Sequence, residues 1–283
     1  MHRFIFEDTM EPIRQAVERA KASGVAPPEP QGRPISARQV QPPGLGNTRP
    51  DHPLHIKEVQ LDRQHLESCR LIAHNAADPR ASSFDMLRTQ VLQSMDQRNW
   101  QFLAVTSPTA GCGKTVTSIN LALSIARQSE RAVFLVDLDF HRPQVASCLG
   151  IKCQNGVLSV LDGRAGLPDA MVQARIDKYQ FLVLPAEGPI LGSSELLASR
   201  AMSSLLQTIK RDFKSYTIIL DMPPMLTGDD VIALLPQLDC VLLVAAVGTS
   251  TLSELKQCSK HLQSAEVVRV VLNKTPDTTV GYG

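Results

Sequence analysis

The chain has 283 residues, of which 43% are hydrophobic and 20% charged, a composition typical of a soluble globular protein with a sizeable core. Lys and Arg (29) nearly balance Asp and Glu (28), which excludes nucleic-acid binding through a general excess of positive charge. The six cysteines form no C-x-x-C pair and no zinc-like cluster with histidine, so we expect the reduced thiols of a cytoplasmic protein.

The first part of the chain divides by composition. Residues 1–24 contain a predicted amphipathic helix that Thr9 can cap and Gly24 can end. Its apolar stripe either docks on another surface or belongs to a frayed tail, and the sequence leaves both readings open. Residues 25–56 are rich in Pro, Gly, Gln and Arg and are predicted to form a flexible linker. The remaining residues, 57–283, are predicted to form one catalytic domain.

From residue 82 onward, short apolar segments alternate with segments of helical periodicity. This alternation predicts a parallel sheet covered by helices on both faces, a Rossmann-like three-layer α/β/α fold. Ligands of such folds bind beyond the carboxyl ends of the strands. The predicted strands are 101–107, 132–139, 181–186, 216–224, 240–247 and 267–274, and the predicted helices are 82–95, 116–128, 156–163, 193–213, 229–238 and 250–265.

Residues 106–115 read TSPTAGCGKT and lie between a predicted strand and a predicted helix, as a phosphate-binding loop requires. Pro108 stands where the G-x-x-x-x-G-K-[ST] pattern has its first glycine. Two glycines still permit a tight turn whose N–H groups point at phosphate oxygens. Lys114 can reach the terminal phosphates and the Thr115 hydroxyl can ligate Mg²⁺. The predicted nucleotide contacts are Ala110, Gly111, Cys112, Gly113, Lys114, Thr115 and Val116.

Acidic residues follow two of the predicted strands. Asp137 and Asp139 end the strand VFLVDLD, and carboxylates there can hold Mg²⁺ or accept a hydroxyl proton during phosphoryl transfer. An ion pair with Arg142 at a solvated strand end is the plainer interpretation, but two acids on one face repel each other without a cation. Asp221 ends the strand TIILD, which is the Walker B pattern.

Asn273 ends the last predicted strand, VVLN. Its amide can both donate to and accept from an adenine edge, which makes it a candidate nucleotide-binding residue. A structural role in the turn after the strand is nearly as well supported, so the motif alone leaves both open.

These pieces, in this order, resemble the bacterial tyrosine kinases, ATPase-like autokinases that regulate capsule and exopolysaccharide synthesis and export. The family pattern S-P-x-x-G-x-G-K-[ST] matches residues 107–115, so Pro108 is a residue that the family places there. The D-x-D motif matches at Asp137 and Asp139, and the family's DTPP segment reads DMPP at 221–224. The segments GVLSVLDG, SSELLAS and VVLNK are further similarities.

The resemblance implies an ATP-dependent protein-tyrosine autokinase that uses ATP and Mg²⁺. It implies that Lys114, Asp137, Asp139 and Asp221 are catalytic and that Thr115, Asp137 and Asp221 hold the metal. The family's C-terminal tyrosine cluster is reduced here to Tyr282, which becomes the expected phosphoacceptor.

The chain departs from the family at other positions. His141 stands where the family usually has arginine after the second aspartate, and Cys112 replaces a common glutamate. The E-x-x-R-x-x-R motif, which mediates ring assembly in the family, reads Ser82, Asp85 and Arg88. A homo-oligomer is therefore only one of the possible assemblies.

The family works with a membrane-spanning polysaccharide copolymerase whose cytoplasmic tail activates the kinase. The longest apolar run, residues 240–247, is far shorter than the roughly 18 residues of a membrane helix. The resemblance therefore implies an activator in trans. It also implies a cytoplasmic kinase held peripherally at the inner face of the plasma membrane by that partner. No nucleic-acid partner is expected.

Three other functions compete with the kinase. A non-kinase ATPase switch of the septum-site or plasmid-partition type carries an additional lysine near the start of its loop, where this chain has Thr109. A scaffold without turnover is disfavoured by the intact lysine and aspartates. An iron–sulfur reductase of similar fold needs suitably placed cysteines, and Cys148 and Cys153 are too close in sequence to support one.

Overall fold

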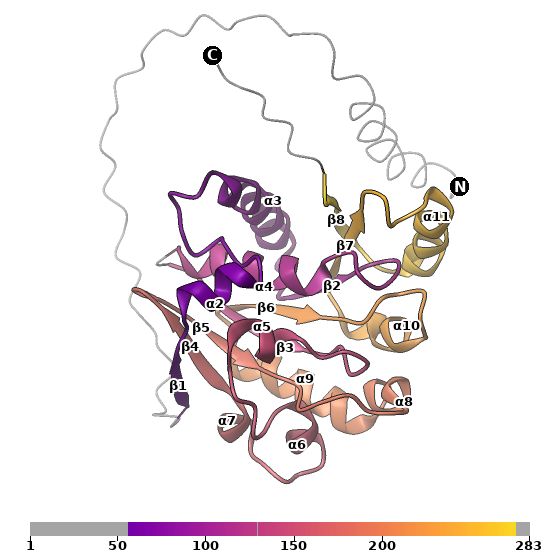
Figure 1. The fold of residues 1–283 in the computed structure, drawn as a ribbon. Coiled ribbons are helices and arrows are strands. Elements are labelled where there is room, and N and C mark those ends of the chain that lie inside the picture. Colours follow the sequence, from indigo (N-terminus) through magenta and orange to yellow (C-terminus); the bar gives the residue numbers. More distant parts are fainter. Residues whose placement is uncertain (1–55, 129, 276–283) are drawn as a thin grey trace, which may run out of the picture. The chain divides into compact units, whose positions relative to one another are not determined.

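The computed structural model describes residues 56–275 except Ser129, so the predicted helix within 1–24, the linker up to residue 55 and Tyr282 lie outside the described residues. The described residues form a sheet between two layers of helices (Figure 1). The strands are β1 (Lys57–Gln60), β2 (Phe102–Thr106), β3 (Ala132–Asp137), β4 (Val172–Ile176), β5 (Tyr179–Leu184), β6 (Tyr216–Asp221), β7 (Cys240–Ala246) and β8 (Val267–Asn273).

The helices alternate with these strands along most of the chain. None that the structure describes has the length and apolar character needed to cross a bilayer. They are α2 (Arg63–Ser68), α3 (Ser82–Arg98), α4 (Lys114–Ala126), α5 (Val145–Leu149), α6 (Val157–Leu161), α7 (Leu167–Ala170), α8 (Ser193–Leu197), α9 (Arg200–Asp212), α10 (Asp230–Leu234) and α11 (Leu252–His261), with short 3₁₀ turns at Pro79–Ala81, Leu235–Gln237 and Leu262–Ser264.

The strand order is β1-β4-β5-β3-β6-β2-β7-β8, and every neighbouring pair is parallel except β4 and β5. The register pairs Asp137 at the end of β3 with Asp221 at the end of β6, and Asp221 with Val105 of β2. Three central strands therefore end level with one another. Their carboxyl ends form one edge, where ligands of such sheets bind.

Each buried strand sends alternate residues to opposite faces of the sheet. In β2, Leu103 and Val105 join the core under α2, α3, α4 and α5, whereas Phe102 and Ala104 join the core under α6 to α11. This two-sided burial explains why the strands read as continuous apolar runs. The predicted three-layer α/β/α class is confirmed.

The structure contains two strands that were not predicted. β1 has the polar sequence KEVQ and β4 reads VQARI, so neither shows the apolar run that marks a strand buried on both faces. β4 pairs in antiparallel fashion with β5 through a tight turn at Asp177, which has a φ of 54°. The sheet is therefore mostly parallel, with one antiparallel pair near an edge.

The predicted helix 193–213 is interrupted. The Ser199 backbone is extended (φ −71°, ψ 158°), and its hydroxyl accepts a hydrogen bond from the Met202 amide, which caps α9. A serine that caps a helix competes with continuation of the preceding one. The segment therefore forms two helices, α8 and α9.

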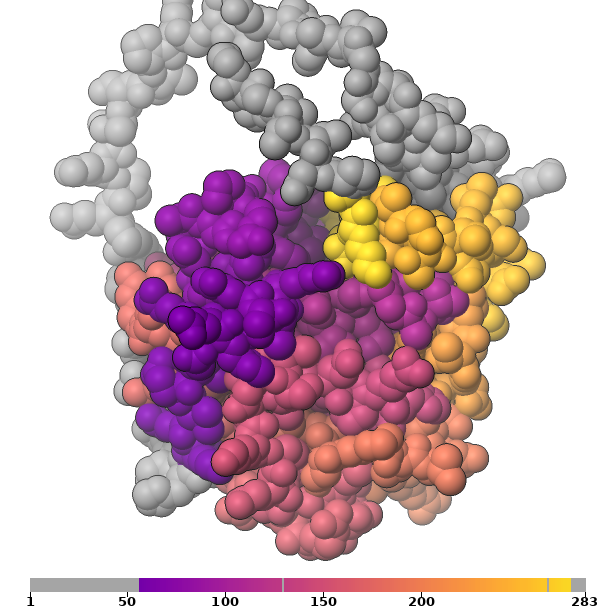
Figure 2. Space-filling view, viewed as in Figure 1, coloured from indigo at the N-terminus to yellow at the C-terminus, as the bar shows by residue number. Residues whose placement is uncertain are grey.

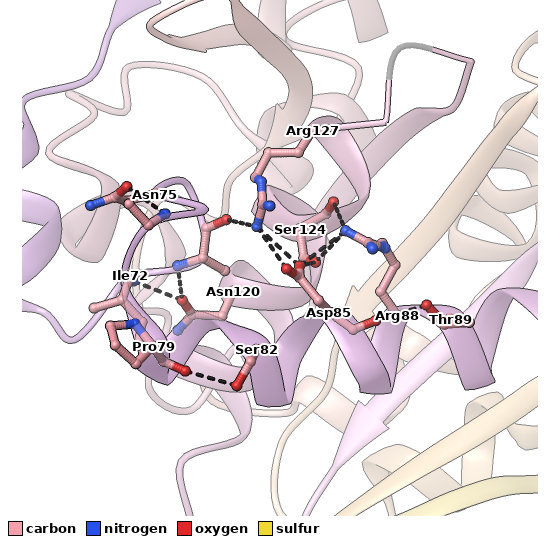
Figure 3. Close-up of polar contacts among 12 residues, drawn as sticks. Ile72, Asn75, Pro79, Ser82, Asp85, Arg88, Thr89, Asn120, Ser124 and Arg127 are labelled. Atoms are coloured by element: carbon pink, nitrogen blue, oxygen red, sulfur yellow. Dashed lines mark hydrogen bonds and ion pairs between the residues drawn. The ribbon is translucent and has the colours of Figure 1, made fainter. Parts of the chain in front are cut away.

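Side chains on the outer face of α4 hold the preceding segment of the chain (Figure 3). The Asn120 amide oxygen accepts hydrogen bonds from the backbone of Ile72 and Ala73, at 2.9 and 3.0 Å. The Asp85 carboxylate of α3 accepts hydrogen bonds from Ser124 (2.6 Å) and Arg127 (3.0 Å). The helix that follows the phosphate-binding loop is thus fixed to the body of the protein by buried polar contacts.

Arg88, the arginine that remains of the family's assembly motif, belongs to the same network. Its guanidinium donates to Asp85 and to the Ser124 carbonyl oxygen, both at 3.0 Å. Figure 3 shows the Arg88 and Arg127 side chains converging on Asp85 from two helices. Both arginine side chains are mostly buried, at 14% and 13% exposed.

The last strand of the described chain packs against the first long helix. α3, in purple, and β8, in yellow, lie side by side on one face (Figure 2). Arg269 of β8 donates a hydrogen bond to the Gln90 side chain of α3 at 3.3 Å. The last strand is therefore supported by the first long helix.

Glu187 holds the start of the GVLSV segment, residues 156–160, through hydrogen bonds to its backbone. Its carboxylate accepts hydrogen bonds from the amides of Gly156 (2.9 Å), Leu158 (2.9 Å) and Ser159 (2.6 Å), which caps α6. A Cβ at Gly156 would lie 2.1 Å from the Pro185 carbonyl oxygen, so only glycine fits there. Partial burial acts to raise the pKa of Glu187, but hydrogen bonds from Ser159 and Leu158 outweigh it and lower this pKa.

We predict that Glu187→Gln lowers the free energy of unfolding by about 2 kcal/mol, because the new NH₂ group faces amide donors. A carboxyl group with a lowered pKa stabilises the fold above its unfolded-state pKa of about 4.3, and this contribution is lost as the pH falls through the lower folded-state value. The gap between variant and wild type therefore narrows in acid. Urea unfolding at pH 7 and pH 3 measures this difference in the free energy of unfolding, with the exposed Glu195→Gln as matched control. If both variants lose the same free energy of unfolding, Glu187 does not cap α6.

Candidate functional site

The loop between β2 and α4 has the backbone of a phosphate-binding loop. Gly111 and Gly113 have φ values of 81° and 92°, which glycine adopts without strain. Among the described residues, no acceptor contacts the N–H groups of Gly111, Cys112 or Gly113. Unpaired amides at a helix N-terminus suit an anion. The donor set therefore fits the phosphates of a nucleotide.

Asn273 closes one side of this loop. Its amide nitrogen donates to the Cys112 carbonyl oxygen at 2.9 Å, and its amide oxygen accepts from the Lys274 backbone at 2.8 Å. A Cβ on Gly113 would lie 2.3 Å from the Asn273 amide nitrogen. The Asn273 side chain thus binds the loop backbone and the turn after β8. A contact with adenine stays a prediction.

Pro108 is held through its carbonyl group. The Pro108 oxygen accepts a hydrogen bond from the Leu226 amide at 3.0 Å, and the preceding Ser107 oxygen accepts one from Met225 at 2.8 Å. The Thr106 hydroxyl donates to the Pro223 carbonyl oxygen at 2.7 Å. The start of the loop is therefore hydrogen-bonded to the DMPP segment and the residues after it. Proline can take part because the group it contributes is its carbonyl oxygen.

Lys114 and Asp139 form a buried ion pair. The Lys114 Nζ atom lies 2.5 Å from an Asp139 carboxylate oxygen, and the two side chains are 11% and 3% exposed. The other Asp139 oxygen accepts hydrogen bonds from the backbone of His141 (3.2 Å) and Arg142 (3.0 Å). The alternative interpretation, an ion pair between the aspartates and the Arg142 side chain, is not among the contacts of the described residues.

Asp221 binds two hydroxyl groups of α4. Thr115 donates to one carboxylate oxygen at 2.7 Å and Ser118 to the other at 2.9 Å. This places the Thr115 hydroxyl, the predicted Mg²⁺ ligand, directly against the predicted Walker B carboxylate. Ser118 was not predicted, although its spacing of four residues from Lys114 places both on one face of the helix.

Asp137 organises the backbone that follows β3. Its carboxylate accepts hydrogen bonds from the amides of Asp139 at 3.2 Å and Val145 at 3.1 Å. These bonds fold residues 138–144 into a loop that presents Asp139 to Lys114. Asp137 and Asp139 therefore bind different partners, although the charge of Asp139 still contributes to raising the pKa of Asp137.

The site carries an excess of buried negative charge. Burial, followed by the charge of Asp221, raises the pKa of Asp137 well above its ordinary value. Burial also raises the pKa of Asp221, against the opposing effect of Lys114. Burial acts to lower the pKa of Lys114, but Asp221 and Asp139 outweigh it and raise this pKa. One ammonium group thus faces three carboxylates, an imbalance that a divalent cation would relieve.

The predicted residues come together except where they lie outside the described chain. Lys114, Thr115, Asp137, Asp139 and Asp221 share one buried site. Of the remaining predicted contacts, the glycines and the exposed Ala110 line the loop, Val116 is half-buried, and the Cys112 side chain is buried, so only its backbone can face a phosphate.

The donor set fits Mg²⁺ only together with a nucleotide. Within the described residues, no three His, Cys, Asp or Glu side chains are grouped so as to hold a metal ion by themselves. Mg²⁺ needs no such cage, because it usually keeps several waters and binds one or two carboxylates plus substrate phosphates. Thr115 with Asp137 and Asp221 is a set of that kind.

Comparison with known proteins places this site in a family. A family model described as "ParA: NUBPL iron-transfer P-loop NTPase" matches residues 99–272, more than half of the chain. The chain belongs to this family of P-loop NTPases. The match begins just before β2 and ends one residue short of Asn273, so it contains the loop and all three aspartates.

Two relatives are tyrosine kinases by name. The putative tyrosine-protein kinase EpsB of Ralstonia nicotianae is 30% identical over 239 residues, which are 82% of this chain and 31% of EpsB. The kinase domain of the Escherichia coli tyrosine kinase Etk is 26% identical and superposes with a TM-score of 0.62, covering 73% of this chain and 81% of that domain. The predicted similarity to bacterial tyrosine kinases is confirmed, and the chain spans about a third of the length of EpsB.

The competing class matches less well. The septum-site-determining protein MinD of Pyrococcus horikoshii, solved with Mg-ADP, is 20% identical with a TM-score of 0.50, covering 61% of this chain and 69% of MinD. At this identity the likeness shows the fold alone. The kinase relatives are therefore the better guide to this site.

We predict that Gly113→Ala costs more stability than Gly111→Ala. Both substitutions place an alanine at positive φ, a strain of about 1–2 kcal/mol, but a Cβ at Gly111 has open space and one at Gly113 meets Asn273. Urea unfolding without nucleotide measures the difference. Asn273→Ala in the Gly113→Ala background should recover only the part of the lost stability that comes from the steric clash. If it recovers no stability, the contact with Asn273 is not the cause of the larger loss in Gly113→Ala.

Proposed function

We propose that this chain is an ATP-dependent protein-tyrosine autokinase that regulates exopolysaccharide or capsular polysaccharide synthesis and export. The observation that carries the proposal is the buried site in which Lys114 faces Asp137, Asp139 and Asp221, on a chain similar to named tyrosine kinases. Its alignment with EpsB covers 82% of this chain.

The loop and Lys114 bind the phosphates of ATP. Within residues 56–275 that the structure describes, no acceptor contacts the amides of Gly111 and Gly113. Lys114 is the cation nearest to them in sequence. When the Lys114 ammonium group turns toward a phosphate, it leaves the Asp139 carboxylate without its partner. ATP binding therefore converts Asp139 from an ion-pair partner into a free carboxylate.

Thr115, Asp137 and Asp221 would hold Mg²⁺ when the nucleotide is bound. The bound ion would supply charge neutralisation at the phosphates. Ser118 keeps the Asp221 carboxylate oriented through its hydrogen bond of 2.9 Å. The Asp137 hydrogen bonds to the backbone keep the loop 138–144 in place.

In the reaction, a bond forms between the tyrosine oxygen and the γ-phosphorus of ATP, and the bond from that phosphorus to the β,γ-bridging oxygen breaks. ADP leaves, and the phenolic proton passes to a carboxylate of the site. Asp139 is suited to this role because its partner Lys114 has turned to the phosphates.

The proposed acceptor is Tyr282, which lies outside the described residues. The other two tyrosines, Tyr179 and Tyr216, begin strands β5 and β6, at the opposite ends of these strands from Asp221. Neither can reach the site of its own chain. The resemblance to the kinase family further supports an activator in trans, the cytoplasmic tail of a membrane polysaccharide copolymerase. Such a partner would hold the kinase at the cytoplasmic face of the plasma membrane.

We predict that incubation with Mg-ATP phosphorylates Tyr282 and that Lys114→Ala lowers the phosphotyrosine yield by at least about a hundredfold, because the phosphate ligand is removed. Phosphopeptide mass spectrometry measures the yield. Tyr282→Phe should retain ATP binding and lose this phosphopeptide.

Copolymerase tail peptide is included in parallel reactions, so that a missing activator cannot mimic an inactive kinase. Steady release of inorganic phosphate with no phosphotyrosine on any of the three tyrosines would overturn the kinase and favour an ATPase switch. If the protein does not bind ATP, the remaining candidate is a scaffold without turnover.

A further inference from the structure

The loop 138–144 carries Asp139 and is held from two sides. On its inner side, Asp137 accepts the Asp139 amide, and Asp139 accepts the amides of His141 and Arg142. These bonds shape the loop, while the buried Leu138 and Phe140 side chains and the Lys114–Asp139 ion pair anchor its first residues. Contacts on its outer side hold the exposed residues that follow.

The outer contacts come from His141 and Phe140. The His141 Nε2 atom lies 3.1 Å from an Asp230 carboxylate oxygen and 3.0 Å from the Ser193 hydroxyl oxygen. Ser193 begins α8 and Asp230 begins α10. The Phe140 carbonyl oxygen accepts a hydrogen bond from the Ile190 amide at 3.0 Å, just before α8. One imidazole therefore ties the loop to two helices at once.

Asp230 depends on this imidazole. Its side chain is only 5% exposed, and its other carboxylate oxygen is buried without a hydrogen-bond partner. Within the described chain, His141 supplies the hydrogen bond that the Asp230 carboxylate receives. A buried carboxylate that loses its last donor is strongly destabilised, so the loop is held where the imidazole can reach it.

We propose that His141 is a positioning residue, which joins the loop 138–144 to Asp230 and Ser193 and thereby holds the Asp139 carboxylate at Lys114. The link runs from Lys114 to Asp139 over 2.5 Å, from Asp139 to the His141 amide, and from the imidazole to Asp230. Its effect on turnover rests on the proposed function, whereas its effect on the loop rests on these contacts alone.

Residue 141 needs an N–H group at the place of Nε2. Glutamine can present its amide nitrogen there and donate to Asp230, whereas alanine cannot. Loss of the donor should loosen the loop while leaving the phosphate-binding amides of residues 111–113 in place. The rate constant for turnover should therefore fall more than the affinity for ATP.

The test compares His141→Ala with His141→Gln, using the exposed His261→Gln and Asp229→Asn as matched controls. Hydrogen–deuterium exchange of residues 138–144 is followed by mass spectrometry on the full chain, and kcat and KM for ATP are measured with Mg²⁺. Urea unfolding verifies that each variant is folded.

We expect His141→Ala to raise exchange in 138–144 about tenfold and to lower kcat about tenfold, with KM within about twofold. His141→Gln and both controls should stay within about threefold of wild type on every readout. Asp230→Asn keeps an oxygen acceptor, so it should loosen the loop less than His141→Ala does.

Unchanged exchange in His141→Ala would overturn the proposal, and so would a His141→Gln variant as loose as His141→Ala. If wild type makes no phosphotyrosine but hydrolyses ATP, the proposed kinase fails while ATP hydrolysis and exchange still decide the role of His141. If there is no turnover at all, exchange alone decides it.

Discussion

One ammonium group against three buried carboxylates is the constraint on which the site depends. Lys114 compensates Asp139 directly and the other two only through space, so the ends of β3 and β6 carry uncompensated charge. Such an arrangement does not stabilise a fold, because desolvation of carboxylates opposes it. The surrounding sheet, buried on both faces, supplies the free energy that keeps these groups together. This desolvation cost is expected for a site that binds a cation and a nucleotide.

Helix α4, which follows the phosphate-binding loop, holds the Lys114 side of this charge cluster in place. Its first turn carries Lys114 and Thr115, and its outer face carries Asn120 and Ser124, which bind the segment 72–85. The phosphate-binding end therefore cannot shift without breaking buried hydrogen bonds farther along the same helix. Preorganised donors of this kind need little rearrangement when charge develops nearby. The loop that carries Asp139 has fewer such bonds, so it is the more adjustable half of the site.

The sequence predicted the parts of this molecule that repeat a pattern. Apolar runs marked the central strands, and aspartates at their ends marked the ligand edge. β1 and β4 were missed because polar residues interrupt both strands and leave no apolar run. The partners of His141 were missed for another reason: Ser193 and Asp230 lie 52 and 89 residues away, and no local spacing connects them. Glu187 was missed likewise, since it caps a helix about 30 residues upstream. Long-range pairing is a property of the packed chain.

The contact between Asn273 and the loop joins residues 161 positions apart. During synthesis the phosphate-binding loop emerges early, whereas β8, which closes one side of it, is among the last described segments to leave the ribosome. The nucleotide site is therefore completed only after β8 has been made. A nascent chain that lacks β8 has the lysine and the aspartates but not the wall beside Gly113, so it should hold ATP less tightly than a chain that includes β8. The position of one asparagine thus links the full affinity for ATP to the completion of the sheet.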